Sequence, residues 1–301
     1  MADVILETAK PETSSPASAT EPAPRPRRSA LAKLLRNRSA LIGGTIVLVF
    51  VLMALLAPLL PLADPLKSNF LAIRKPPSEI HWFGTDELGR DQVSRLFYGA
   101  QTSLLAGIVS VLIALAIGIP FGLLSGWYGG WIDIAISRVT EAMLACPFLI
   151  LAIAFAAILG PSLTNAMIAI GLSAVPIFIR LVRGQVMSVK AEDFVEGARA
   201  VGARDLRIMF VHVLPNTMSP IVVQSTLFMA QAIILEASLS FLGLGQQPPS
   251  PSWGQMLNVA KNFMEQAPWM SVAPGIAIFL AVLGFNLLGD GLRDALDPKE
   301  G

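Results

Sequence analysis

The side chains that could act together as acids and bases in this sequence gather in one stretch, residues 84–91. Its sequence GTDELGRD places Asp86, Glu87, Arg90 and Asp91 among turn-forming residues. Paired carboxylates can serve as a general acid and a general base, but no nucleophile or convergent base accompanies these. We therefore expect this stretch to be a structural loop near the outer surface of the protein.

The remaining reactive side chains do not indicate a metal or nucleotide site. His81 and His212 are far apart in sequence, and Cys146 is the single cysteine, so no disulfide or cysteine-based metal site can form within the chain. The chain has no GxxxxGK-S/T phosphate-binding loop and so cannot hydrolyse ATP by a Walker-type site alone. We expect no bound metal or cofactor and no enzymatic activity.

The composition is that of an integral membrane protein. Only 14% of the 301 residues are charged and 54% are hydrophobic, whereas a soluble domain carries about 25% charged residues. The mean hydropathy is +0.64. The net charge of +1 gives no reason to expect a nucleic-acid partner.

Six nearly uncharged stretches are long enough to cross a membrane, since a spanning helix needs about 20 apolar residues. An even number of spans puts both termini on one side. With the termini in the cytoplasm, the inner segments hold 16 Lys and Arg residues and the outer loops hold six, which agrees with the positive-inside rule. The predicted spans are 41–62, 102–124, 138–158, 164–182, 218–242 and 271–289.

These spans divide an all-α chain into five parts. The parts are a disordered and then basic amphipathic cytoplasmic segment (1–40), the first span (41–62), an extracytoplasmic loop (63–101), a core (102–289) and a cytoplasmic tail (290–301).

Within the second span, overlapping small-xxx-small repeats are formed by Gly118, Gly122 and Gly126. Such repeats let helices approach closely.

Glu236 is the one charged residue within the fifth span. An ionisable group inside a membrane is costly and by default suggests function. Two interpretations stay open. Glu236 either faces a translocation cavity or a partner helix, or it is an interfacial carboxylate that snorkels or pairs locally.

A polar segment separates the fourth and fifth spans, with eight charges between Lys190 and Arg207. Val195, Ala198 and Val201 fit one face of a short helix, and Gly202 permits a sharp bend. A second short helix would end at Leu214-Pro215. We predict an amphipathic helix pair at the inner membrane surface, suited to docking in a groove of another protein.

This segment resembles the "EAA" loop of permeases from binding-protein-dependent ABC importers. The pattern is Glu-Ala-Ala, three residues, Gly, nine residues, Ile, one residue, Leu-Pro. The chain matches its spacing throughout and departs at two positions, where Gly197 replaces the first Ala and His212 replaces Ile. The matching residues are Glu196, Gly197, Ala198, Gly202, His212, Leu214 and Pro215.

Further stretches resemble the dipeptide, oligopeptide and nickel branch of that family, and the glutathione permeases are similar. They are HWFGTDELGRDQVSRLFYGAQTSLLAG (81–107), EASLSFLGLGQQPPSPSWGQML (236–257) and NLLGDGLRDALDPK (286–299). The resemblance covers roughly residues 30–300 and implies the six-span fold of a type I ABC importer permease in the bacterial inner membrane. It also gives residues 84–91 a second interpretation, as a contact for the binding protein.

The resemblance implies an importer of dipeptides or short peptides that uses ATP without binding it. The chain would form half of the pathway in the lipid bilayer, beside a second homologous permease. Two ATP-binding subunits would hold ATP and magnesium and dock on the matching residues, and an extracytoplasmic binding protein would deliver the substrate. Oligopeptides, glutathione and a nickel complex remain as alternative substrates. An ion-gradient-driven secondary transporter and a membrane enzyme are the alternative functions.

Overall fold

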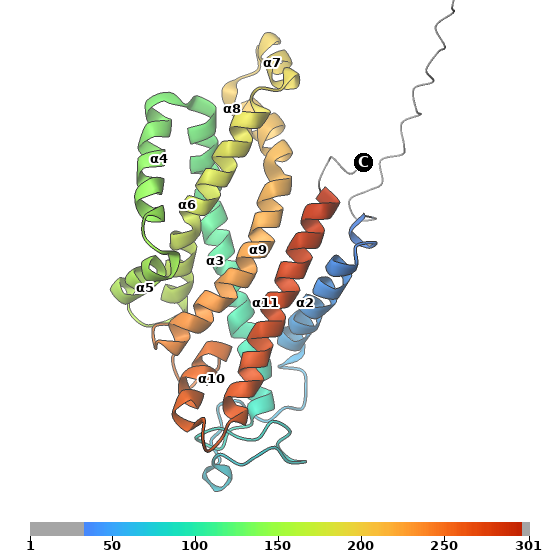
Figure 1. The fold of residues 1–301 in the computed structure, drawn as a ribbon, viewed down its shortest axis with the longest axis vertical. Coiled ribbons are helices and arrows are strands. Elements are labelled where there is room, and N and C mark those ends of the chain that lie inside the picture. Colours follow the sequence, from blue (N-terminus) through green and yellow to red (C-terminus); the bar gives the residue numbers. More distant parts are fainter. Residues whose placement is uncertain (1–32, 297–301) are drawn as a thin grey trace, which may run out of the picture.

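The computed structural model describes residues 33–296, which fold into a bundle of helices (Figure 1). Five helices are long and apolar enough to cross a membrane, and a bent helix pair is a sixth if it counts as one span. The all-helical class is thus confirmed. The five are α2 (Arg38–Leu56), α3 (Gln92–Tyr128), α6 (Leu163–Val189), the continuous helix Asp205–Phe241 and α11 (Trp269–Leu296).

The bent pair replaces the predicted third span, 138–158. α4 (Gly130–Leu144) and α5 (Phe148–Leu159) meet at an angle of 93°. Pro147 begins α5 in an extended conformation, because proline lacks the N–H that would continue the helix and disfavours helical geometry at the preceding Cys146. The chain therefore turns sharply at Cys146-Pro147, where the apolar length of the sequence predicts one straight span.

α3 also begins ten residues before the predicted second span, inside what was expected to be the loop 63–101. Asp91 caps the helix by accepting a hydrogen bond from the Ser94 N–H at 2.9 Å. Arg95 lies inside the helix because its guanidinium is buried and paired, with Asp86 at 3.3 Å and the Gln255 side-chain oxygen at 3.0 Å. A count of uncharged residues cannot find such a start.

The two ends of the described chain lie together. The Asn37 side-chain amide donates to the Asp294 carboxylate at 2.8 Å. A Cβ on Gly291 would come within 2.4 Å of the Ala40 Cβ, so α2 and α11 are in close contact there. This end of the bundle also carries the polar segment after α6 (Figure 1), in agreement with the predicted even number of spans. The predicted amphipathic segment falls mostly on residues 1–32, outside the described residues.

The glycine repeat on α3 packs directly against another helix, as predicted, and the structure shows that this helix is α6. Added Cβ atoms at Gly118, Gly122 and Gly126 would come within 2.5, 2.6 and 2.8 Å of side chains on α6. The facing residues Phe178, Val182 and Val186 are spaced four apart, so the two helices match over two turns. Small residues allow this approach without any polar contact.

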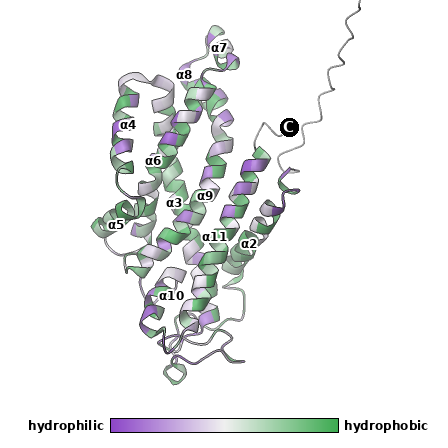
Figure 2. Cartoon of the chain, in the orientation of Figure 1, coloured by the Kyte–Doolittle hydropathy of each residue, from purple (hydrophilic) through white to green (hydrophobic). Residues whose placement is uncertain are grey.

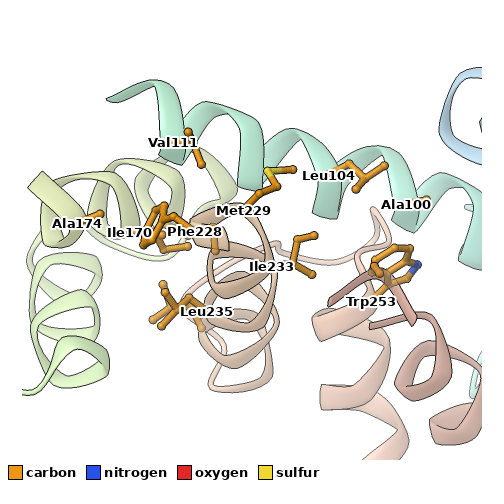
Figure 3. Packing of buried hydrophobic residues seen from close by; sticks show 14 of the residues in the cluster. Ala100, Leu104, Val111, Ile170, Ala174, Phe228, Met229, Ile233, Leu235 and Trp253 are labelled. Atoms are coloured by element: carbon orange, nitrogen blue, oxygen red, sulfur yellow. The ribbon is translucent and has the colours of Figure 1, made fainter. Parts of the chain in front are cut away.

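The centre of the bundle is a cluster of apolar side chains from α3, α6, α9 (Leu214–Phe241) and α10 (Trp253–Ala260) (Figure 3). The Phe228 ring meets the rings of Phe178 and Phe148 edge to face, at centroid distances of 5.8 and 5.9 Å. Hydrophobic residues cover most of the helices, whereas hydrophilic ones stand out on α7 (Asp193–Ala200) and α8 (Asp205–Arg207) (Figure 2).

Candidate coupling site

The polar segment after α6 forms a short exposed helix, α7, followed by a sharp turn. Gly202 has a φ of +81°, in the left-handed region that favours glycine. The turn is closed by two backbone hydrogen bonds, from Gly202 to the Arg199 carbonyl at 2.9 Å and from Ala203 to the Ala198 carbonyl at 3.1 Å. The predicted bend at Gly202 is therefore present.

The predicted stop at Leu214-Pro215 is wrong. The helix runs without a break from Asp205 to Phe241, over 37 residues. Pro215 is the second residue of α9, and the six residues before α9, Ile208–Val213, form a π-helical turn. A π-helical turn changes the backbone hydrogen-bond pattern locally, so the spanning helix can continue although Pro215 has no N–H to donate. The second half of the segment is thus one end of a spanning helix.

Trp127, near the end of α3, supports the cytoplasmic segment. The Lys190 ammonium donates to the Trp127 carbonyl at 2.5 Å and lies 5.5 Å from the centre of its ring. The Arg199 guanidinium carbon lies 4.8 Å from the same ring. Two cations, Lys190 at the end of α6 and Arg199 in the last turn of α7, thus contact one buried indole, an arrangement that sequence spacing did not reveal.

An apolar layer fixes the inner side of the segment. Val195 of α7 is fully buried, as are Ile208 and Val213 of the π-helical turn, and they pack with side chains of α3 and α6. Ala198 is half-buried in the same layer. Val201 was expected on this face but is 84% exposed, because it lies beyond the last residue of α7.

The outer side of the segment is open. Glu196 and Gly197 are exposed, and a Cβ added to Gly197 would meet nothing within 4 Å. Phe194, Leu206 and Phe210 expose 44%, 61% and 56% of their surfaces. A carboxylate flanked by apolar side chains on a supported helix can dock in a protein groove.

The other matching residues lie closer to the bundle. His212 and Leu214 are half-buried, whereas Pro215 is exposed. The His212 carbonyl accepts a hydrogen bond from the Asn216 amide at 2.6 Å, one turn further along the helix. These three residues therefore sit at the base of the helix and do not share the outer surface of α7.

An ion pair missed from the sequence ties α4 to α6 near this site. Arg183 donates two hydrogen bonds to Asp133, from Nε at 2.6 Å and from Nη2 at 2.7 Å. Ser125 of α3 donates to the same carboxylate at 2.5 Å. Both residues lie beside long apolar stretches, Asp133 alone and Arg183 three residues after Arg180, but spacing alone could not pair them.

Glu236 is fully buried inside the subunit. It accepts hydrogen bonds from Ser103 of α3 at 3.0 Å and from Ser240 at 2.7 Å. It is therefore not a snorkelling carboxylate at a lipid surface. Its part in a translocation pathway stays a prediction.

The charged stretch 84–91 packs as a loop. Asp86 pairs with the Arg90 Nε at 2.6 Å, and both side chains are almost completely buried. Glu87 accepts from the Arg90 Nη2 at 2.7 Å. Burial, followed by repulsion from Asp86, raises the pKa of Glu87. His81 contacts Asp91 at 2.8 Å, so the stretch holds itself together, as expected of a structural loop.

Comparison with protein families agrees with this geometry. Residues 118–300 match the family described as the binding-protein-dependent transport system inner membrane component. Residues 25–77 match the N-terminal transmembrane domain of oligopeptide transport permease C.

Individual relatives cover almost the whole chain. The dipeptide transport system permease protein DppC of Alkalihalophilus pseudofirmus is 49% identical over 91% of this chain and 90% of its own. The glutathione transport system permease protein GsiD of Escherichia coli is 48% identical over 88% of each chain. The DppC of Haemophilus influenzae is 44% identical over 88% of this chain and 92% of its own.

The fold also resembles a solved structure, the MetNI methionine ABC transporter in inward-facing conformations. The TM-score is 0.55 at 21% identity, over 67% of this chain and 97% of the matched chain. At this identity the likeness concerns the fold, which is that of an ABC importer permease.

Proposed function

Because this chain belongs to the family of binding-protein-dependent ABC importer permeases of the inner membrane, we propose that it moves dipeptides or other short peptides into the cell. The family makes the chain a non-catalytic transport component and implies ATPase and binding-protein partners. The peptide substrate is supported by the two DppC relatives at 49% and 44% identity. Glutathione, a tripeptide, is the second candidate because the GsiD relative is 48% identical.

In the proposed complex this chain forms half of the pathway beside a second homologous permease. Two ATP-binding subunits supply the ATP and magnesium sites, since this chain has no phosphate-binding loop of the Walker type. No cofactor is proposed on this chain. Membrane lipid surrounds the bundle, as the exposed apolar residues along α2 and α11 suggest.

The coupling surface is proposed to be the outer side of α7, with Glu196 and the neighbouring Phe194 as its centre. Support for this comes from its combination of exposure on one side and firm packing on the other, where Val195 is buried and Arg199 stacks on Trp127. A docked surface that is rigidly joined to α3 can transmit the movement of an ATPase subunit to the bundle as a rigid-body shift.

The complete complex in proteoliposomes tests the function. We expect uptake of a labelled dipeptide that requires the binding protein outside and ATP at the ATPase subunits. Uptake that continues without ATP would instead favour a secondary transporter. Calorimetry on the binding protein with a dipeptide, glutathione and a nickel complex identifies the substrate, and binding of glutathione alone would replace the dipeptide assignment.

A further inference from the structure

Glu236 lies at the outer end of the helix that begins in the coupling segment. The continuous helix Asp205–Phe241 starts next to α7 and spans 37 residues, a length of about 55 Å. Its last turns carry Glu236 and Ser240. The chain then loops through residues 242–252 and begins α10 at Trp253, against the same helix.

Two hydrogen-bond chains end on the two oxygens of Glu236. The Trp253 N–H donates to the Ser103 Oγ at 3.3 Å, and that hydroxyl donates to Oε2 at 3.0 Å. The Gln246 N–H donates to the Ser240 Oγ at 2.9 Å, and that hydroxyl donates to Oε1 at 2.7 Å. Each serine accepts from a backbone N–H, so its only proton is left for the carboxylate.

The Glu236 carboxylate therefore links three elements, and it acts only as a hydrogen-bond acceptor. Ser103 belongs to α3, Gln246 to the loop and Trp253 to α10. Among residues 33–296, Glu236 forms no ion pair. A carboxyl group buried without a counterion is an expensive way to fill space. Both of its oxygens accept serine protons, which the single oxygen and the NH2 group of a glutamine in its place cannot do.

The start of α10 is packed as closely as it is hydrogen-bonded. A Cβ added to Gly254 would come within 2.5 Å of the Ala237 backbone, so α10 rests directly on α9. Trp253 is fully buried, donates from Nε1 to the Leu96 carbonyl at 3.1 Å, and lies in the central cluster (Figure 3). Its ring also meets Phe50 of α2 edge to face at 5.3 Å.

We propose that Glu236 is a positioning residue that fastens α10 and the loop 242–252 to α3 and α9. A movement of the coupling segment at one end of the helix then carries α10 with it at the outer end. The inference rests on the proposed function, because it takes ATP-driven movement as its source. It assigns to Glu236 the mechanical connection between the two sides of the membrane.

The test compares Glu236→Gln and Ser103→Ala with the control Ser238→Ala in the complete reconstituted complex. Gln keeps the shape of Glu236 but presents a donor to one serine, and Ala removes one of the two chains. Ser238 is half-buried on the same helix, and its hydroxyl donates to the Ile234 carbonyl one turn back. Cys146 is replaced by serine, and spin labels are attached at Lys67→Cys and Asn262→Cys. They report the distance between the loop that contains residue 67 and the end of α10, with and without ATP.

We expect the unmodified complex and the control to give the same narrow distance distribution with and without ATP, because the fastened elements move together, and the same ratio of ATP hydrolysed to peptide transported. Both test variants should broaden the distance distribution and raise that ratio at least about tenfold, as the loss of a buried hydrogen bond predicts. ATPase activity without the binding protein should persist. This separates loss of positioning from failure to assemble.

An unchanged ratio and a narrow distance distribution in Glu236→Gln would overturn the proposal. If that variant does not assemble, Ser103→Ala decides by the same two measurements. The distance measurement needs no substrate. Failure of the unmodified complex to transport a dipeptide would therefore count against the proposed substrate only, whereas a distance that changes with ATP in the unmodified complex would overturn the inference.

Discussion

The Arg199 guanidinium carbon lies 4.8 Å from the centre of the Trp127 ring, so the exposed helix α7 rests on the end of a spanning helix. Trp127 is only 2% exposed, whereas Arg199 is exposed. A cation–π contact whose cation faces water is worth about 0.5–1 kcal/mol. This contact joins α7 to the end of α3.

Replacing Trp127 by alanine should loosen α7 and uncouple ATP hydrolysis from transport. Amide hydrogen exchange over residues 193–200 should accelerate about tenfold or more, because both cation contacts and the apolar seat are lost. Trp131→Ala is the matched control, since that tryptophan is 79% exposed. Equal exchange rates in the two variants would show that Trp127 does not support α7.

Alanine should have opposite effects at the two glycines of the coupling segment. Gly202→Ala strains a residue at φ +81° and costs about 1–2 kcal/mol, so transport and binding of the ATPase subunits should fall. Gly197→Ala has open space around its Cβ and should favour the helix by up to about 1 kcal/mol. Co-purification of the ATPase subunits and transport measure both. Full activity of Gly202→Ala would contradict the need for this bend.

Removing the carboxylate of Glu196 tests the docking surface itself. Glu196 is exposed at the centre of that surface, so Glu196→Gln should leave the melting temperature unchanged while weakening ATPase-subunit binding. Glu192→Gln, also exposed and just before the same helix, is the control for charge. If both variants bind the ATPase subunits like the unmodified chain, the docking site lies elsewhere.

The Asp133–Arg183 pair should contribute to stability, unlike an exposed pair on the same helix. Asp133→Asn is expected to cost about 1–3 kcal/mol, because two short charge-assisted hydrogen bonds between α4 and α6 are lost. The Arg138–Glu141 pair is mostly exposed, and breaking it should cost less than about 1 kcal/mol. Double-mutant cycles by thermal unfolding in detergent compare the pairs, and equal coupling energies would refute the difference.

Glu87 should make stability depend on pH in a defined direction. Its pKa in the folded chain is raised above the ordinary value of 4.5, so it favours the folded state at acidic pH and this contribution is lost as pH rises through the raised pKa. The melting temperature of Glu87→Gln should therefore rise relative to that of the unmodified chain as pH increases above 4.5. Glu79→Gln, in the exposed part of the same loop, controls for net charge. A difference independent of pH would contradict the raised pKa.

Much of this protein could be predicted from its sequence because the signals are local. Apolar length located the five long membrane helices, and the eight charges from Lys190 to Arg207 marked the polar segment that separates two of them. The glycine repeat at Gly118, Gly122 and Gly126 predicted the close contact that α3 makes with α6. The positive φ of Gly202 follows from the same kind of signal, a residue type suited to one backbone conformation.

The errors arose where a distant contact changes the meaning of a local signal. Arg95 looked like the edge of a span, yet its pairing with Asp86 and Gln255 lets it lie inside α3. Leu214-Pro215 looked like a stop, yet a π-helical turn carries the helix through it. At Pro147 the apolar stretch predicted a continuous span, yet the chain turns there by 93°.

The sequence by itself determined that this chain crosses the membrane and which glycines allow tight packing. Only the tertiary structure decided what surrounds Glu236, because Ser103 and Trp253 lie far from it along the chain and meet it only when α10 folds back against α3 and α9. Apolar length and residue spacing are properties of one helix. The partners of a buried carboxylate depend on how several helices pack.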